Sequence, residues 1–192
     1  ITSLNDLRIL IPASFGMQWS GLMFPDGQIA DVSDSNFSVI PATITTASVA
    51  PASLVAGISG NATAGFTTQN TIPASGKIVI TFPANFNLAS AAYSSSTGIN
   101  GTTFIATPVG QVVTITGITS TTAGAKTLVL SGVKNPDATG TTGTYSIATK
   151  TLADATIDSV SGVTGNTIAN GGSLTSTNVQ PASLFAAAVG NV

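Results

Sequence analysis

Apolar and polar residues alternate with a period of two over many short stretches of this chain, and such alternation is typical of half-buried β-strands. In residues 76–83, for example, Ile78, Ile80 and Phe82 fall on one face, whereas Lys77 falls on the other. Comparable stretches, separated by turn residues, cover residues 62–68, 102–106, 111–116, 126–133 and 144–151. About seven short strands separated by Gly, Pro, Asn and Ser turns predict an all-β chain folded as an antiparallel two-sheet sandwich.

Local signals add three expectations, about a strand end, a turn and a short helix. Pro83 cannot donate a hydrogen bond to a neighbouring strand, so the strand before it is expected to end there. Asn100 and Gly101 both tolerate positive φ and predict a two-residue turn. The stretch from Leu88 to Tyr93 is rich in Ala, which favours one or two turns of helix.

Missing residue types exclude several kinds of chemistry. The 192 residues include no His and no Cys. A catalytic triad with histidine, a cysteine nucleophile and zinc, copper or iron–sulfur sites therefore cannot form. A pair of Asp residues remains open as an enzymatic alternative, although no Asp lies in a recognisable catalytic motif. The sequence predicts no enzyme and no cofactor.

Calcium is a further alternative, because Asp carboxylates are oxygen ligands. Asp31 and Asp34 lie in one short acidic segment, and Asp154 and Asp158 form a second loose pair. Neither segment has the twelve-residue loop pattern of a dedicated calcium site. We expect solvated loop carboxylates and no metal site.

Charge is scarce, at 6% of residues with a net charge of −2. The basic residues are spread along the chain as Arg8, Lys77, Lys126, Lys134 and Lys150, whereas nucleic-acid binding needs several on one face. No apolar run approaches the length of about 18 residues that a membrane span needs. A surface rich in Thr, Ser and Gly with so little charge favours an extracellular location at the cell surface.

An internal repeat is the most informative feature of the chain. Residues 49–62 (VAPASLVAGISGNA) align without a gap with residues 179–192 (VQPASLFAAAVGNV) at an offset of 130, and a weaker match extends upstream to residues 44–45 and 174–175. Residues 10–15 also resemble residues 81–86. The expected organisation is a partial β module in residues 1–47 with the later strands of a repeat, a complete module in residues 48–178, and in residues 179–192 the first strand of a following module or a donor strand.

The complete module also resembles a known family. Its strand and turn patterns in residues 66–68, 72–83, 128–136 and 140–147 resemble immunoglobulin-like repeats that occur in tandem in large secreted surface proteins of microbes. The resemblance implies an immunoglobulin-like β-sandwich with an extracellular structural or adhesive role, and it brings no catalytic residue to this chain. The chain departs from antibody domains because it lacks their Cys pair and their strand-C Trp; its one Trp, Trp19, lies outside the complete module.

The position of the repeat suggests how the protein assembles. A module without its opening strands exposes an unpaired sheet edge, which a strand from another chain can fill. The expected intersubunit strand residues are Val179, Leu184, Phe185, Ala186 and Val189. Head-to-tail contacts of this kind build a filament unless they close into a ring. The sequence therefore predicts a structural, non-catalytic subunit of an extracellular filament or cell-surface appendage, whose partners are copies of itself.

Two alternatives stay open. In the first alternative, the chain is a fragment of a long tandem-repeat adhesin, and its partners are adjacent repeats of the same polypeptide. A carbohydrate-binding surface protein, with surface glycans as partners, is a further reading, although aromatic residues are few.

Three Asn-x-Ser/Thr sequons, at Asn36, Asn61 and Asn100, are candidates for N-glycosylation in a glycoprotein. In a chain so rich in Ser and Thr, such sequons also arise by chance.

Overall fold

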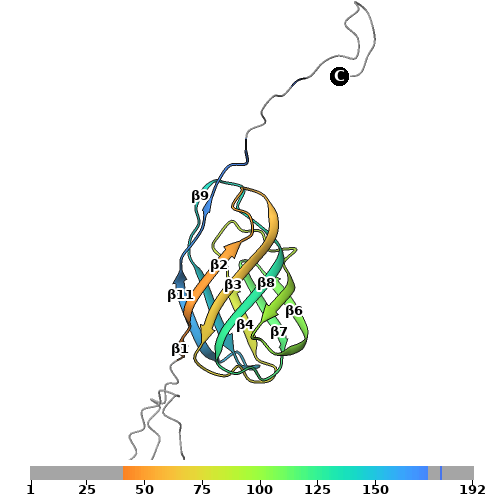
Figure 1. The fold of residues 1–192 in the computed structure, drawn as a ribbon, viewed down its shortest axis with the longest axis vertical. Helices are drawn as coiled ribbons and strands as arrows, with labels where there is room; N and C mark the ends of the chain where they lie inside the picture. The colour runs from red at the N-terminus through yellow and green to blue at the C-terminus, as the bar shows by residue number, and fades with distance from the viewer. Residues whose placement is uncertain (1–40, 173–177, 179–192) are drawn as a thin grey trace, which may run out of the picture.

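The computed structural model describes residues 41–172 and Asn178, which form two packed β-sheets (Figure 1). The strands are β1 (Ala42–Thr43), β2 (Thr45–Pro51), β3 (Ser59–Thr68), β4 (Lys77–Thr81), β5 (Ala92–Thr97), β6 (Gly101–Val109), β7 (Val112–Ile118), β8 (Gly124–Lys134), β9 (Gly140–Thr141), β10 (Tyr145–Lys150), β11 (Thr156–Val163) and β12 (Thr167–Ile168). The partial module and the donor strand predicted from the sequence fall almost wholly outside these residues.

One sheet has six strands in the order β1-β11-β10-β4-β7-β6, and the other has four in the order β2-β3-β8-β5. The short strands β9 and β12 pair with each other. The predicted all-β sandwich is therefore confirmed. Its strands pair antiparallel except for β1, which runs parallel to β11.

The core lies between the sheets and follows the predicted alternation. Ile78 and Ile80 of β4 are fully buried, as is Phe82 just beyond it, while Lys77 lies on the other face. The strand ends at Thr81, close to Pro83 as predicted. The rings of Phe82, Phe86 and Tyr145 contact one another at centroid distances of 5.4–5.9 Å. Edge-to-face contacts of this kind favour a single packing arrangement in the core.

Two local predictions were wrong. Asn100 and Gly101 do not form a two-residue hairpin turn, because residues 98–100 carry the chain from β5 in one sheet to β6 in the other, and the positive φ there belongs to Gly98. The two-residue turn lies instead at Gly110–Gln111, between β6 and β7. Residues 88–93 form no helix and lead into β5, because pairing with β8 outweighs the helix propensity of Ala.

No helix long and apolar enough to cross a membrane occurs in the described part of the chain.

Candidate assembly surfaces

The sandwich receives the chain at one end of its long axis and releases it at the other (Figure 1). We call the end with β1 and residues 151–155 the lower pole, and the end with residues 52–58 and 135–139 the upper pole. At the upper pole the departing chain is held by two hydrogen bonds, from Ala169 N to Leu54 O (2.8 Å) and from Ala56 N to Ala169 O (2.9 Å). Successive units joined through these ends would therefore follow one another along the long axis.

The exposed charges of the described residues lie at the two poles. At the lower pole Lys77 Nζ contacts Asp154 Oδ1 at 2.9 Å. Lys150 lies beside Lys77, because the two residues are opposite each other in the register of β10 and β4. The hydrogen bond and the positive charge of Lys77 lower the pKa of the Asp154 carboxyl. At the upper pole Lys134 contacts Asp137 at 2.8 Å. Each pole thus carries both signs of charge, while the outer faces of the sheets between them are uncharged.

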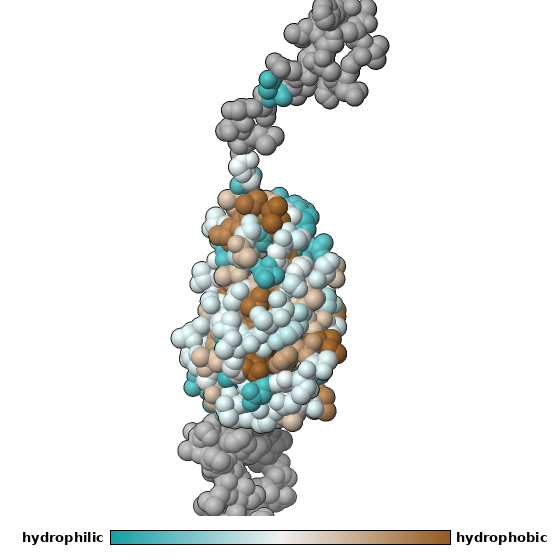
Figure 2. Space-filling model, turned by 45° about the vertical axis from the view of Figure 1, so that its right-hand side comes forward, coloured by the Kyte–Doolittle hydropathy of each residue, from teal (hydrophilic) through white to brown (hydrophobic). Residues whose placement is uncertain are grey.

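Three of the five large exposed hydrophobic side chains of the described residues lie at the poles. Leu54 and Ile58 lie at the upper pole and are 43% and 47% exposed, and Leu152 lies at the lower pole and is 66% exposed. The remaining two, Ile105 and Val109, belong to β6. Figure 2 shows hydrophobic surface at the upper end, where the chain leaves the sandwich. Singly exposed apolar side chains are common on protein surfaces, so these residues are candidates for a contact through their position at the poles.

The opening segment of the sandwich, residues 42–51, lies at the edge of both sheets. β1 pairs with β11 in one sheet, and Ile44 N donates to Ser159 O at 3.0 Å. The chain then crosses over at Thr46, whose φ is 49°, and β2 pairs with β3 in the other sheet. Only Ile44 and Val49 of this segment are buried. An edge segment with two apolar anchors is the kind of element that a strand from another molecule can replace.

The predicted intersubunit residues Val179, Leu184, Phe185, Ala186 and Val189 lie outside the described residues. Their counterparts in the repeat, residues 49–62, are described, and they span the end of β2, the connection at the upper pole and the start of β3. Val179 aligns with Val49, which is buried, whereas Leu184 aligns with Leu54, which is exposed. Continuing the offset upstream aligns residues 172–181 with the opening segment, so that Leu174 takes the position of Ile44.

Two of the three sequons are described, and their environments differ. Asn61 lies in β3 with an exposed side chain, whereas Asn100 lies in the connection between the sheets. Asn100 Nδ2 donates to Ser120 O at 3.0 Å, and its backbone N donates to Thr121 Oγ1 at 2.9 Å. Asn36 lies outside the described residues.

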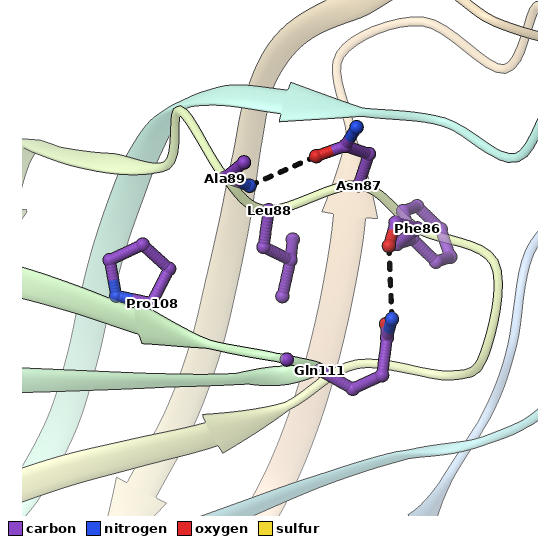
Figure 3. Close-up of a pocket in the computed structure, with 7 residues that line it drawn as sticks. Phe86, Asn87, Leu88, Ala89, Pro108 and Gln111 are labelled. Atoms are coloured by element: carbon purple, nitrogen blue, oxygen red, sulfur yellow. Dashed lines mark hydrogen bonds between the residues drawn. The ribbon is translucent and has the colours of Figure 1, made fainter.

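A pocket of about 520 Å³ opens between residues 86–89 and the β6–β7 turn (Figure 3). Gln111 Nε2 donates to Phe86 O at 3.1 Å, and Asn87 Oδ1 accepts from Ala89 N at 3.0 Å. The Oε1 atom of Gln111 is buried and has no hydrogen-bond partner among the described residues. A second hollow, of about 240 Å³, lies at the upper pole. Neither pocket is lined by a titratable side chain, so neither offers a general acid or base.

Asp158 contradicts the expectation of a solvated loop carboxylate. It lies on β11 and is fully buried, and Asn70 donates to it through both its backbone N (3.2 Å) and its Nδ2 (2.8 Å). Asp154, by contrast, is exposed in a turn, as predicted. Within residues 41–172 no cluster of acidic residues has the composition of a metal site. Asp158 therefore joins the start of β11 to the loop after β3.

Lys126 is the second buried charged side chain of the described residues. Its Nζ donates to the backbone carbonyl oxygen of Gly124 at 3.1 Å. Burial lowers the pKa of this lysine. The contact is made to backbone alone and points to a structural role.

The aromatic side chains of the described residues give no flat platform for a sugar. Phe66, Phe82, Phe86 and Tyr145 are buried. Tyr93 of β5 stacks on Phe104 of β6, with ring centroids 4.6 Å apart, and so closes the side of the sandwich between the two sheets.

These features define a class, an all-β sandwich that the chain enters and leaves at opposite poles, where its exposed charges also lie. No protein-family model matches the chain, and no curated protein matches it. Among solved structures, the chain is similar to BslA, a bacterial hydrophobin, with 18% identity over 67% of this chain and 98% of that chain and a TM-score of 0.39. It is also similar to a non-cellulosomal cohesin from the hyperthermophilic archaeon Archaeoglobus fulgidus, with 10% identity over 62% of this chain and 91% of that chain and a TM-score of 0.35. Both TM-scores are below 0.5, so the fold class rests on the strand pairing of this chain itself.

Proposed function

We propose that this chain is a structural, non-catalytic unit of an extracellular filament or cell-surface appendage, in which β-sandwich modules follow one another end to end. One observation carries the proposal: the strands of the described sandwich run from Ala42 to Ile168, a length close to the internal repeat offset of 130 residues, and the chain enters and leaves the sandwich at opposite poles. A repeating unit with this geometry extends along one axis instead of closing on itself. Its partners are copies of itself or adjacent repeats.

The poles supply the proposed contact between successive units. Leu54 and Ile58 at the upper pole face outward, as does Leu152 at the lower pole. Burying each of these partly exposed side chains would contribute about 1 kcal/mol. Both poles carry charges of both signs, so opposite charges can face each other across the contact. The uncharged sheet faces allow many copies to lie close together without repulsion.

Strand complementation is the proposed way in which separate chains join. The opening segment of a module lies at the edge of both sheets and is anchored by Ile44 and Val49. Because residues 172–181 align with that segment, we expect Leu174 and Val179 to be the anchors that enter the partial module predicted for residues 1–47 of a neighbouring chain, which lacks opening strands of its own. Leu184 and Phe185 align with the connection at the upper pole and are expected to contribute to the contact between poles.

The alternative, one long polypeptide of tandem modules, uses the same axial arrangement with covalent links between modules. A carbohydrate-binding role receives less support, because no aromatic side chain of the described residues is exposed.

The test of strand complementation uses the full chain with single substitutions at Leu174→Asp and Val179→Asp. Gln180→Asp is the matched control, since Gln180 aligns with Ala50, which faces solvent. Filaments are counted by electron microscopy and by sedimentation. We expect Leu174→Asp and Val179→Asp to lose ordered filaments and Gln180→Asp to keep them, with the thermal unfolding midpoint of the sandwich unchanged in all three. Ordered filaments from Val179→Asp at the level of the unsubstituted chain would refute the donor strand.

A further inference from the structure

Asn61 is the one described sequon residue whose side chain lies free on a sheet face. Its backbone O accepts a hydrogen bond from Ala52 N at 2.8 Å, which fixes the backbone in the sheet. Its side chain is exposed and makes no hydrogen bond to any other described residue. The carboxamide nitrogen is therefore accessible from solvent in the folded protein.

The third residue of the sequon lies on the same face. Side chains two residues apart on a strand point to the same side, and both Asn61 and Thr63 are exposed, while Ala62 between them is buried. A glycosyltransferase needs the hydroxyl of Thr63 close to the Asn61 carboxamide. The strand presents both groups to solvent together.

The surroundings of Asn61 leave room for a bulky group. β3 pairs with β8 at Gly60 and again at Ala62, so Asn61 lies opposite the irregularity at Ser131 and Gly132. Ser131 has a small side chain and Gly132 has none, so the neighbouring strand places no bulky residue directly beside Asn61.

Asn100 provides the contrast. Its Nδ2 is engaged with Ser120 O, and its backbone N and O bond to Thr121 Oγ1 and Thr119 N. The next residue, Gly101, lies so close to Phe104 that a Cβ atom there would approach the Phe104 ring to 2.4 Å. Asn100 thus holds the crossing between the sheets, and its carboxamide is not free to reach an enzyme.

From this geometry we infer that Asn61 is a glycosylation site, which carries an Asn-linked oligosaccharide on the uncharged outer face of the four-stranded sheet. A bond forms between Asn61 Nδ2 and C1 of the sugar. The bond between C1 and a phosphate oxygen of a polyisoprenyl-phosphate-linked oligosaccharide donor breaks, the phosphate leaves, and a base of the transferase takes the amide proton. The glycan supplies polarity to a face that has hydroxyl groups but no charge.

Mass spectrometry of the full chain, produced in its native host, tests the inference. We expect a hexose-containing mass on the peptide with Asn61, its complete loss in Asn61→Gln and in Thr63→Ala, and its retention in Thr63→Ser. Asn100→Gln is the matched control and should leave the glycan in place. An unmodified Asn61 peptide in the unsubstituted chain, or a glycan that disappears only with Asn100→Gln, would overturn the inference. Thermal unfolding of each variant separates loss of the glycan from loss of the fold.

Discussion

At the scale of single residues, the buried polar groups decide which parts of the sandwich are fixed together. Asp158 is an example, because both of its carboxylate oxygens accept hydrogen bonds from Asn70, 88 positions away in the chain. Residue type alone predicts that an isolated Asp lies on the surface, since unpaired carboxylates are rarely buried. No local signal would have found it, because Ile157 and Val160 of β11 fall on opposite faces by alternation and define no inward register for Asp158.

Asp158→Ala is expected to destabilise the protein by about 2–3 kcal/mol, because it leaves the donors of Asn70 without a partner in the interior. Asp154→Asn is the control, because Asn tolerates the positive φ of 66° at this turn as Asp does. It removes the negative charge that faces Lys77 on the exposed surface, where such pairs contribute little, and should leave the unfolding transition nearly unchanged. Urea unfolding followed by fluorescence or circular dichroism measures both. Equal losses in the two variants would contradict the structural role of Asp158.

Tyr145 gives the fold a dependence on alkaline pH. Burial raises the pKa of its phenol, and the hydrogen bond from Asn166 opposes this in part. Since the folded pKa lies above the unfolded value of about 10, the contribution to stability is complete below that pH and is lost as the pH rises through the folded pKa. The unfolding midpoint should fall above about pH 10, and it should fall less steeply in Tyr145→Phe. The same alkaline decline in both proteins would rule Tyr145 out as its cause.

At the scale of strands, the sequence predicted the alternating elements well and the irregular ones poorly. The runs in β3, β4, β7, β8 and β10 carry apolar residues at every second position, and their buried faces lie where that period places them. β5 was missed because its sequence, AYSSST, carries little apolar signal, and it is held by pairing with β8 instead. The pairing of β1 with β11 joins residues about 115 positions apart, a distance over which local patterns give no information.

The positions of β-bulges are the features of the strands that local sequence patterns predict least well. Gly117 of β7 has a φ of 85°, and a Cβ atom there would lie 1.8 Å from Thr103 O of β6. Gly117→Ala should therefore destabilise the fold by several kcal/mol, about 3 or more, because a strand backbone has to move. Gly110→Ala is the matched control. Its φ is also positive, at 56°, but no atom lies within 4 Å, so a loss of about 1 kcal/mol is expected from the backbone conformation alone. Thermal unfolding distinguishes the two, and equal losses would mean that the contact with Thr103 is relieved without cost.

At the scale of the whole molecule, the strands run from Ala42 to Ile168, which is close to the repeat offset in length, but no sequence pattern showed which residues lie at the two poles. The offset of 130 residues came from short matches at residues 49–62 and 179–192. That Leu54, Ile58 and Leu152 gather at the two poles depends on how distant turns come together, and a single sequence does not contain this information. The sequence indicated only that Leu54, Ile58 and Leu152 lie near residues that favour turns. The assembly role of the residues beyond position 178 stays a prediction.

The most direct measurement of the central claim is helical averaging of electron micrographs of the native protein. Our account predicts filaments in which the sandwich lies with its long axis along the filament and repeats at its own pole-to-pole length, with the residues around Leu54 and Ile58 of one unit against those around Leu152 of the next. Filaments in which the sandwiches lie across the axis and touch through their sheet faces, or native material made only of separate single sandwiches, would contradict it.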